Sequence, residues 1–231
     1  RVMGFVWKII ITVLSAGAIM GAQPVAATAA EKSMSVFVSI LPQAYFVERI
    51  ADGKARVSVL VGPGQSPHTY EPTPQQMARL SDADIYFSIG LPFEKRLLQK
   101  ITGIARSLVV VDTGRGIALR TTEGHKDNDH AQSMLDPHIW LAPLLIKIQA
   151  ATISEALCAH DPANAGVYRD NLKAFQSELD VLDAEIREKI KPFAGREIFV
   201  FHPAFGYYTD AYGLRQIAIE TQGKEPGSRS L

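Results

Sequence analysis

Short apolar runs that look like buried strands alternate with helical runs through the first half of the chain. The strand-like runs cover residues 36–40, 57–61, 85–89 and 108–111, and the helical runs between them cover 43–51, 74–80 and 93–101. A strand, a helix and a second strand in succession form a β-α-β unit, whose two strands are parallel. The alternation therefore predicts an α/β fold with a mainly parallel sheet.

A long amphipathic stretch follows at residues 161–192. Asp161 suits the cap of a helix and Pro162 its first position. Apolar residues then recur at steps of mostly four and three: Tyr168, Leu172, Phe175, Leu179, Leu182, Ile186 and Ile190. About 30 residues would form a helix of roughly 45 Å. A coiled coil is the alternative, but α/β sequence lies on both sides, so we interpret the stretch as a rigid helix that joins two lobes.

The α/β pattern restarts after this helix but covers few residues. A strand-like run at 197–201 precedes a helical run at 203–212 and a second strand-like run at 216–219. Two strands are too few for a sheet that is stable alone, so we expect the second lobe to be incomplete in this chain. The predicted organisation is an N-terminal lobe over 31–160, a linking helix over 161–192 and a partial C-terminal lobe over 193–231.

The first 30 residues have the order of a secretory signal peptide. Arg1 and Lys8 flank the start of an apolar segment at 9–22, and the small residues that follow offer a cleavage site at 27–29. A membrane anchor is the alternative, but the uncharged run is shorter than the roughly 20 apolar residues that a spanning helix needs. We predict export with removal of residues 1–30.

The cysteine content and the net charge limit which cellular compartment and which partners the protein can have. Cys158 is the only cysteine, so no internal disulfide can form and no cysteine near the cleavage site could carry a lipid. An exported chain with these features fits a bacterial periplasm. The 24 basic residues balance the 24 acidic ones, so net charge gives no reason to expect nucleic acid as a partner.

Three histidines each lie beside a proline in a loop or at the end of a strand. They are His68 in G-P-G-Q-S-P-H-T-Y-E-P, His138 in D-P-H-I-W-L and His202 in F-H-P-A-F-G-Y-Y. Loops just past the carboxyl ends of strands are where open α/β sheets bind ligands. Neutral imidazole is the commonest metal ligand, and three imidazoles suit zinc. A hydrogen-bonded structural role is the alternative for each histidine alone, but together they predict a transition-metal site.

Other side chains could support such a site. His125 and His130 lie in a polar stretch at 113–136 and could capture metal loosely, although a solvated loop that happens to hold two histidines explains them as well. Glu71 and Asp136 flank the proposed ligands and could orient an imidazole from behind.

The sequence contains few motifs that are typical of enzymes. The chain has no H-E-x-x-H, no G-x-S-x-G and no P-loop. Three histidines and a water are also the ligands of some catalytic zinc ions, and Glu71 could serve such a site as a general base. We nevertheless expect no catalysed reaction.

Several segments together resemble the periplasmic metal-binding proteins of zinc and manganese ABC transporters, the ZnuA-like group. They are V-S-I-L-P-Q, P-H-T-Y-E-P-T-P-Q-Q-M, A-D-I-Y-F-S-I-G, D-P-H-I-W-L, the long helix with Y-R-D-N-L, F-H-P-A-F-G-Y-Y and G-K-E-P. They occur in order over nearly the whole chain after the signal. The resemblance implies two α/β lobes, a long joining helix and a metal in the cleft between the lobes.

The resemblance also implies roles for individual residues. His68 and His138 match the ligands of the first lobe, and His202 matches the third ligand. Histidine at that third position is typical of zinc binders, whereas manganese binders tend to have glutamate. The segment from Glu123 to His130 resembles a short form of the family's histidine-rich loop. The family's fourth ligand, an aspartate or similar residue, would lie beyond Leu231, so water or an open position is expected in its place.

We therefore predict a monomeric periplasmic protein that captures Zn²⁺ and delivers it to an ABC permease of the inner membrane. The first alternative is a Mn²⁺ or Fe²⁺ carrier of the same type. A zinc-dependent hydrolase and a surface adhesin are the alternatives from other classes.

Overall fold

The structure, a computed structural model, describes residues 33–101, 103–121 and 135–219. The predicted signal peptide at 1–30, the two histidines His125 and His130, and the last residues of the chain lie outside these ranges. The elements in chain order are β1 (Met34–Ile40), α1 (Leu41–Ala51), β2 (Ala55–Val61), α2 (Pro74–Ser81), β3 (Ile85–Ser88), α3 (Pro92–Ile101), β4 (Val109–Asp112), η1 (Ile139–Leu141), α4 (Pro143–His160), η2 (Pro162–Asn164), α5 (Ala165–Ile190), η3 (Lys191–Phe193), β5 (Glu197–Val200), α6 (Gly206–Tyr212) and β6 (Arg215–Ala218).

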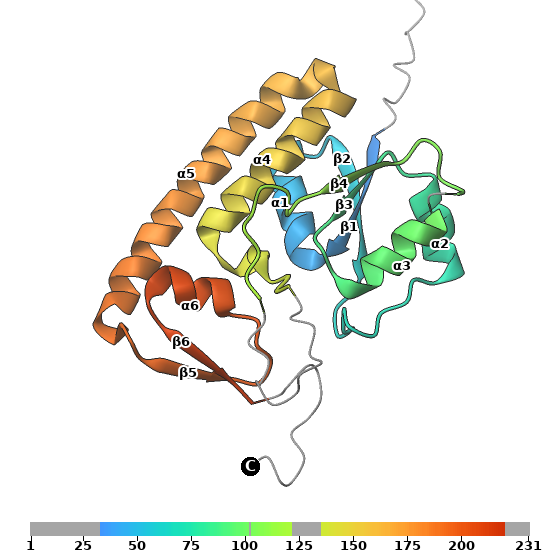
Figure 1. The fold of residues 1–231 in the computed structure, drawn as a ribbon. Helices are drawn as coiled ribbons and strands as arrows, with labels where there is room; N and C mark the ends of the chain where they lie inside the picture. The colour runs from blue at the N-terminus through green and yellow to red at the C-terminus, as the bar shows by residue number, and fades with distance from the viewer. Residues whose placement is uncertain (1–32, 102, 122–134, 220–231) are drawn as a thin grey trace, which may run out of the picture. The chain divides into compact units, whose positions relative to one another are not determined.

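Four parallel strands form the first sheet in the order β2-β1-β3-β4 (Figure 1). In register, Val36 of β1 lies between Val57 of β2 and Ile85 of β3, and Ile85 in turn pairs with Val109 of β4. Parallel strands all end at the same edge of a sheet. The loops that follow β2, β3 and β4 therefore meet at one edge, which is where the predicted ligand His68 lies.

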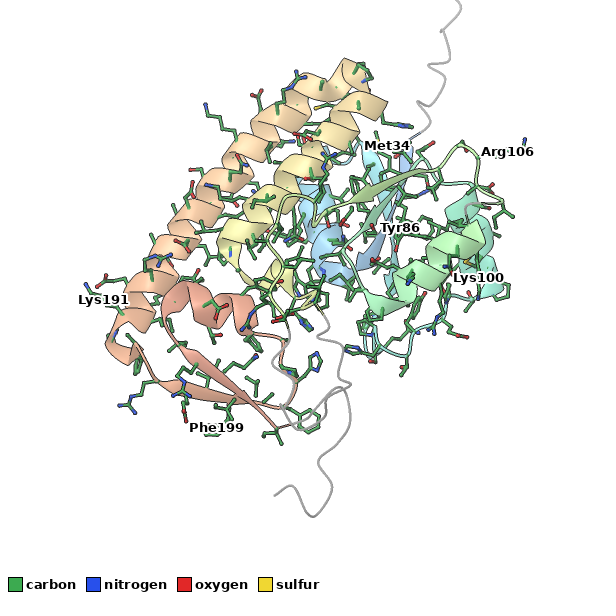
Figure 2. All side chains as sticks on the ribbon, in the orientation of Figure 1. Met34, Tyr86, Lys100, Arg106, Lys191 and Phe199 are labelled. Atoms are coloured by element: carbon green, nitrogen blue, oxygen red, sulfur yellow. The ribbon has the colours of Figure 1, made fainter. Side chains whose placement is uncertain are left out.

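Helices cover both faces of this sheet. Side chains alternate along a strand, so Val38 packs into one core with α1, α4 and α5, whereas Phe37 packs into a second core with α2 and α3. Tyr86 of β3 belongs to the second core and is fully buried (Figure 2). Burial on both faces is what a parallel sheet requires, and it explains why the strands look like nearly continuous apolar runs.

The long helix is shorter than the sequence pattern suggests. It was expected over 161–192, whereas α5 covers Ala165–Ile190 and has a 3-10 turn at each end. Asp161 caps the first of these turns, since its carboxylate accepts from the Asn164 N–H at 3.4 Å. Pro162 is the first residue of the turn before α5, a position at which proline's missing N–H costs no hydrogen bond. Figure 1 shows α5 running beside α4 and on to the second sheet.

The second sheet has two parallel strands, β5 and β6, in the described part of the chain. The helix between them was expected over 203–212 but begins only at Gly206. Residues 201–203 bend instead, because Ala204 N–H donates to the His202 carbonyl at 2.8 Å. Phe199 is 71% exposed on this sheet (Figure 2).

The predicted fold class, α/β with mainly parallel sheets and a long joining helix, is confirmed. The exact lobe boundaries at 160 and 192 stay a prediction. None of the helices in the described ranges combines the length and apolar character that a membrane span requires.

Candidate metal centre

A pocket of about 460 Å³ lies at the carboxyl-terminal edge of the first sheet. Its walls are Ser66, Pro67, His68, Thr69, Leu91, His138, Trp140, Leu141, His202 and Ala204. They come from the loop after β2, the loop after β3, the segment around η1 and the loop after β5. Because β1 lies between β2 and β3, this edge holds the switch point at which open α/β sheets bind ligands.

The loop between β2 and α2 presents His68. Gly64 has a φ of 76°, a region that glycine adopts without strain. The Gly62 N–H donates to the Gln65 side chain at 2.8 Å, and the His68 N–H donates to Ser66 Oγ at 3.3 Å. These turns bring the exposed His68 ring to the pocket.

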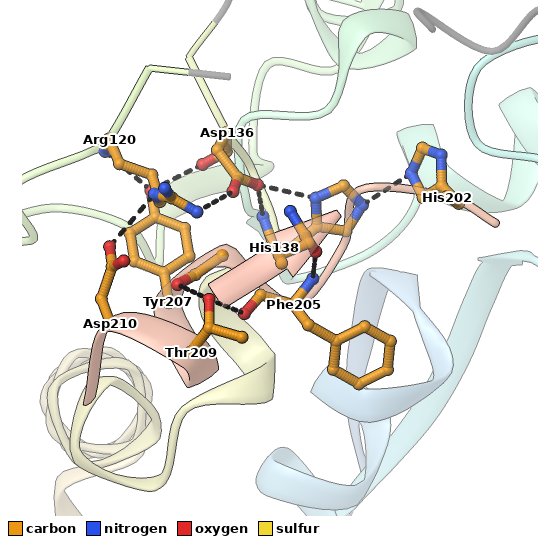
Figure 3. Close-up of polar contacts among 10 residues, drawn as sticks. Arg120, Asp136, His138, His202, Phe205, Tyr207, Thr209 and Asp210 are labelled. Atoms are coloured by element: carbon orange, nitrogen blue, oxygen red, sulfur yellow. Dashed lines mark hydrogen bonds and ion pairs between the residues drawn. The ribbon is translucent and has the colours of Figure 1, made fainter. Parts of the chain in front are cut away.

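The buried carboxylate of Asp136 orients His138. One oxygen, Oδ1, accepts from the His138 backbone N–H at 3.0 Å and from Nδ1 of the ring at 2.7 Å (Figure 3). Asp136 is only 1% exposed, so water competes little for these bonds. With its proton on Nδ1, the ring keeps a lone pair on Nε2, the atom that meets His202.

His202 brings the loop after β5 to the same place. Its Nε2 lies 3.1 Å from Nε2 of His138 (Figure 3). Its ring centroid lies 5.0 Å from that of His138 and 5.2 Å from that of His68. The structure thus brings together the three histidines that the sequence singled out, two from the first sheet's edge and one from the second sheet's.

The pair of Nε2 atoms can be tested against the geometry of a metal. Two ligands of a tetrahedral zinc at 2.0–2.1 Å lie roughly 3.3 Å apart, close to the 3.1 Å between His138 and His202. Among the described residues, no three His, Cys, Asp or Glu side chains are already arranged to hold a metal ion. The residues fit zinc as donors, and Nε2 of His138 and Nε2 of His202 are the pair whose spacing suits one ion.

Aromatic side chains surround the histidines. The Trp140 ring lies 5.0 Å from that of His138 and forms part of the pocket wall. Tyr207 lies behind the pocket, where its hydroxyl donates to the Asp136 carbonyl at 2.7 Å. Burial raises the pKa of Tyr207 above its ordinary value, so this hydroxyl keeps its proton and remains a donor at neutral pH.

The structure does not bring the other predicted site residues that it describes into the pocket wall. Glu71 lies on an exposed part of the loop that carries His68 and is not among the residues that line the pocket. Its role as an outer partner of a ligand stays a prediction. His125 and His130 fall outside the described residues.

The sequence did not point to several residues of this site. Leu91 lines the pocket, and Arg120 lies behind Asp136, with Nη1 3.9 Å from Oδ2. Arg120 falls in a polar stretch without periodicity or motif, so nothing in the sequence distinguished it from a solvated arginine.

Comparison with known proteins gives consistent matches. The family model described as "ZnuA: Zinc-uptake complex component A periplasmic" matches residues 36–231. The high-affinity zinc uptake system protein ZnuA of Yersinia pestis is 30% identical over 222 residues, which take in 86% of this chain and 70% of that protein. A crystal structure of ZnuA is 42% identical, with a TM-score of 0.78 over 86% of this chain and 74% of the other.

The alignments also show how much of a relative's length this chain spans. A curated relative from Chlamydia muridarum is 34% identical over 187 residues. That alignment covers 80% of this chain and 64% of the relative, so this chain spans just under two thirds of the relative's length.

Proposed function

Because this chain belongs to the ZnuA family of periplasmic zinc-uptake components, we propose that it captures Zn²⁺ and delivers it to an ABC permease for uptake. Zinc is then the cargo, held in an interlobe cleft by His68, His138 and His202. The protein acts as a periplasmic monomer and catalyses no reaction. The zinc uptake named for the Yersinia pestis relative supports this role.

The observation that carries the proposal is the chemistry of the pocket wall. Three imidazoles line it, and none of its described residues is a carboxylate. Nitrogen donors favour zinc, whereas manganese and magnesium favour oxygen donors. A hydrolase would also need a general base beside the metal, and Asp136 is buried behind His138 as a hydrogen-bond acceptor.

The remaining residues take supporting roles in this proposal. Asp136 holds the His138 ring so that Nε2 faces the metal. Three histidines would leave the fourth position of a tetrahedral zinc to water or to a further donor. His125 and His130 pass metal to the site, and Glu71 supports a ligand from outside the pocket.

Isothermal titration of the full chain with zinc tests the site. The variant with both His68→Ala and His202→Ala should bind zinc more than roughly 100-fold more weakly, since losing even an outer partner of a ligand costs 10–100-fold. Binding should also weaken as the pH falls, because protonated imidazole cannot bind a metal.

A matched control comes from His160, which lies beside Asp84 and lines a different pocket. His160→Ala should leave zinc binding unchanged. If wild type binds zinc no more tightly than the double variant, the assignment of the site is wrong. Competition between zinc and manganese on the same protein separates a zinc carrier from a manganese or iron(II) carrier.

A further inference from the structure

Arg120 lies where the segment that carries His138 meets helix α6 of the second sheet. Its guanidinium lies 3.9 Å from Oδ2 of Asp136 and 3.2 Å from Oδ2 of Asp210 on α6 (Figure 3). The other oxygen of Asp136 holds the ring of His138. One arginine thus connects α6 to the carboxylate that orients a predicted ligand.

The backbone around Arg120 makes the same connection. The Arg120 N–H donates to the Tyr207 hydroxyl at 3.0 Å, and that hydroxyl donates to the Asp136 carbonyl at 2.7 Å. The Asp136 N–H donates back to the Arg120 carbonyl at 2.9 Å. A tyrosine of α6 therefore bridges the two chain segments on which Arg120 and Asp136 lie.

Gly206, the first residue of α6, is packed directly against this pair. A Cβ at Gly206 would lie 1.4 Å from Nη1 of Arg120, 2.5 Å from its Cζ and 2.9 Å from Oδ2 of Asp136. Any side chain at 206 would force the Arg120 guanidinium to move. The helix can approach the guanidinium this closely because the residue at 206 has no side chain.

We propose that Arg120 is a positioning residue for metal binding. This proposal rests on the proposed function. It holds Asp136 behind His138 and ties both to α6, the helix that follows the His202 loop. The orientation of His138 and the position of the His202 loop are thereby coupled. A buried carboxylate such as Asp136 is stable only when its charge is paired and its oxygens accept hydrogen bonds, and Arg120 supplies the charge.

Two variants test this role in the full chain. Arg120→Gln removes the charge, and Gly206→Ala keeps the charge but displaces the guanidinium. We expect each to weaken zinc binding by roughly tenfold or more, as losses behind a metal-binding histidine do. Zinc affinity is measured by competition with a chromogenic chelator. Gly206→Ala also keeps the test available if Arg120→Gln fails to fold.

Arg187→Gln is the matched control. Arg187 also ties α6 to the rest of the chain, since it donates to the Ala211 carbonyl at 3.1 Å, but its partner is Asp183 on α5 and not Asp136. If Arg187→Gln weakens zinc binding as much as Arg120→Gln, Arg120 acts only by holding α6, and the proposal is overturned.

The tautomer of His138 gives a readout that mere packing would not move. Long-range proton–nitrogen NMR spectra of the metal-free protein should show the proton on Nδ1 in wild type and in Arg187→Gln. They should show a mixture of tautomers in Arg120→Gln and Gly206→Ala. An unchanged tautomer in both of these variants contradicts the proposal.

A double variant completes the test. In an Arg120→Ala background, Gly206→Ala should cost less zinc affinity than it does in wild type, because no guanidinium remains to be displaced. Equal costs in the two backgrounds would overturn the coupling. If wild type itself fails to bind zinc at the three histidines, the proposed function fails, whereas the tautomer measurement still decides the role of Arg120.

Discussion

Glu94 is a buried carboxylate that shapes the pocket from a distance. It is 3% exposed, and one of its oxygens, Oε2, accepts from the N–H groups of Gly90 at 2.7 Å and Leu91 at 3.0 Å. Ser39 Oγ also donates to it. Because Leu91 lines the pocket, Glu94 holds part of the pocket wall in place. Burial raises the pKa of Glu94 above its ordinary value of 4.5.

This raised pKa predicts how stability depends on pH. Above pH 4.5 the folded state binds more protons at Glu94 than the unfolded state does, so this contribution is fully present below pH 4.5 and is lost as the pH rises through the folded-state pKa. The unfolding free energy of wild type minus that of Glu94→Gln should therefore fall as the pH rises. Urea unfolding of both proteins from pH 4 upward, at intervals of about one unit, measures the difference.

A surface variant provides the comparison for this measurement. Glu178→Gln removes an exposed ion pair with Arg49, and such pairs contribute only about 0–1 kcal/mol. Its unfolding free energy should stay close to that of wild type at each pH. A Glu94 difference that is flat or grows with pH would show that burial does not control this group.

At the scale of the element, α5 has different surroundings before and after Leu179. The sequence predicts one apolar stripe along its whole length, but its fully buried residues all lie at or before Leu179. Tyr168, Phe175 and Leu179 pack into the core with α1 and α4, whereas Leu182 is 44% exposed. Beyond Leu179, α5 leaves the core formed with α1 and α4 and meets α6 through polar contacts of Asp183 and Arg187. Burial of the apolar stripe therefore stabilises the fold more before Leu179 than after it.

Two leucines of α5 allow this difference to be measured with one chemical change. Leu179→Ala removes a side chain that is 5% exposed and should lower the unfolding free energy by about 2–5 kcal/mol. Leu182→Ala should lower it by less than about 1 kcal/mol, since most surface substitutions fall within ±0.5 kcal/mol. Unfolding of wild type and of the two variants in guanidinium chloride measures both losses of unfolding free energy. Equal losses would mean that Leu182 is packed as well as Leu179.

At the scale of the whole molecule, the candidate metal site draws on segments that are far apart in the chain. His68 follows β2, His138 precedes α4 and His202 follows β5. A zinc ion held by all three would connect the edges of the first and second sheets. Ligand that binds only the folded state stabilises it by mass action.

Zinc should therefore raise the thermal midpoint of the full chain. At a free zinc concentration about 100 times the dissociation constant, the gain is about 2.7 kcal/mol, or roughly 5–10 °C for a chain of this size. Differential scanning fluorimetry with and without zinc measures the shift. The His202→Ala variant should lose most of it, and magnesium should give none. A shift that persists in His202→Ala would place the stabilising zinc elsewhere.

Much of the fold and part of the site could be predicted from the sequence because the signals are local. Strand and helix patterns predicted nearly every element of the first sheet, since apolar periodicity reflects which face of an element is buried. His68, His138 and His202 stood out because each lies beside a proline at the end of an element. Asp136 could be found because it lies two residues from His138, within reach of its ring.

Only the tertiary structure decided which distant groups meet. Three features depend on contacts between segments far apart in the chain. The apolar stripe of α5 is fully buried only as far as Leu179, His202 lies 3.1 Å from His138, and Arg120 reaches both Asp136 and Asp210. Such contacts leave no periodic trace in the sequence. What the sequence by itself determined is the α/β class, the long joining helix and the three candidate ligands. The packing of α6 against Arg120, which Gly206 permits, was decided by the fold.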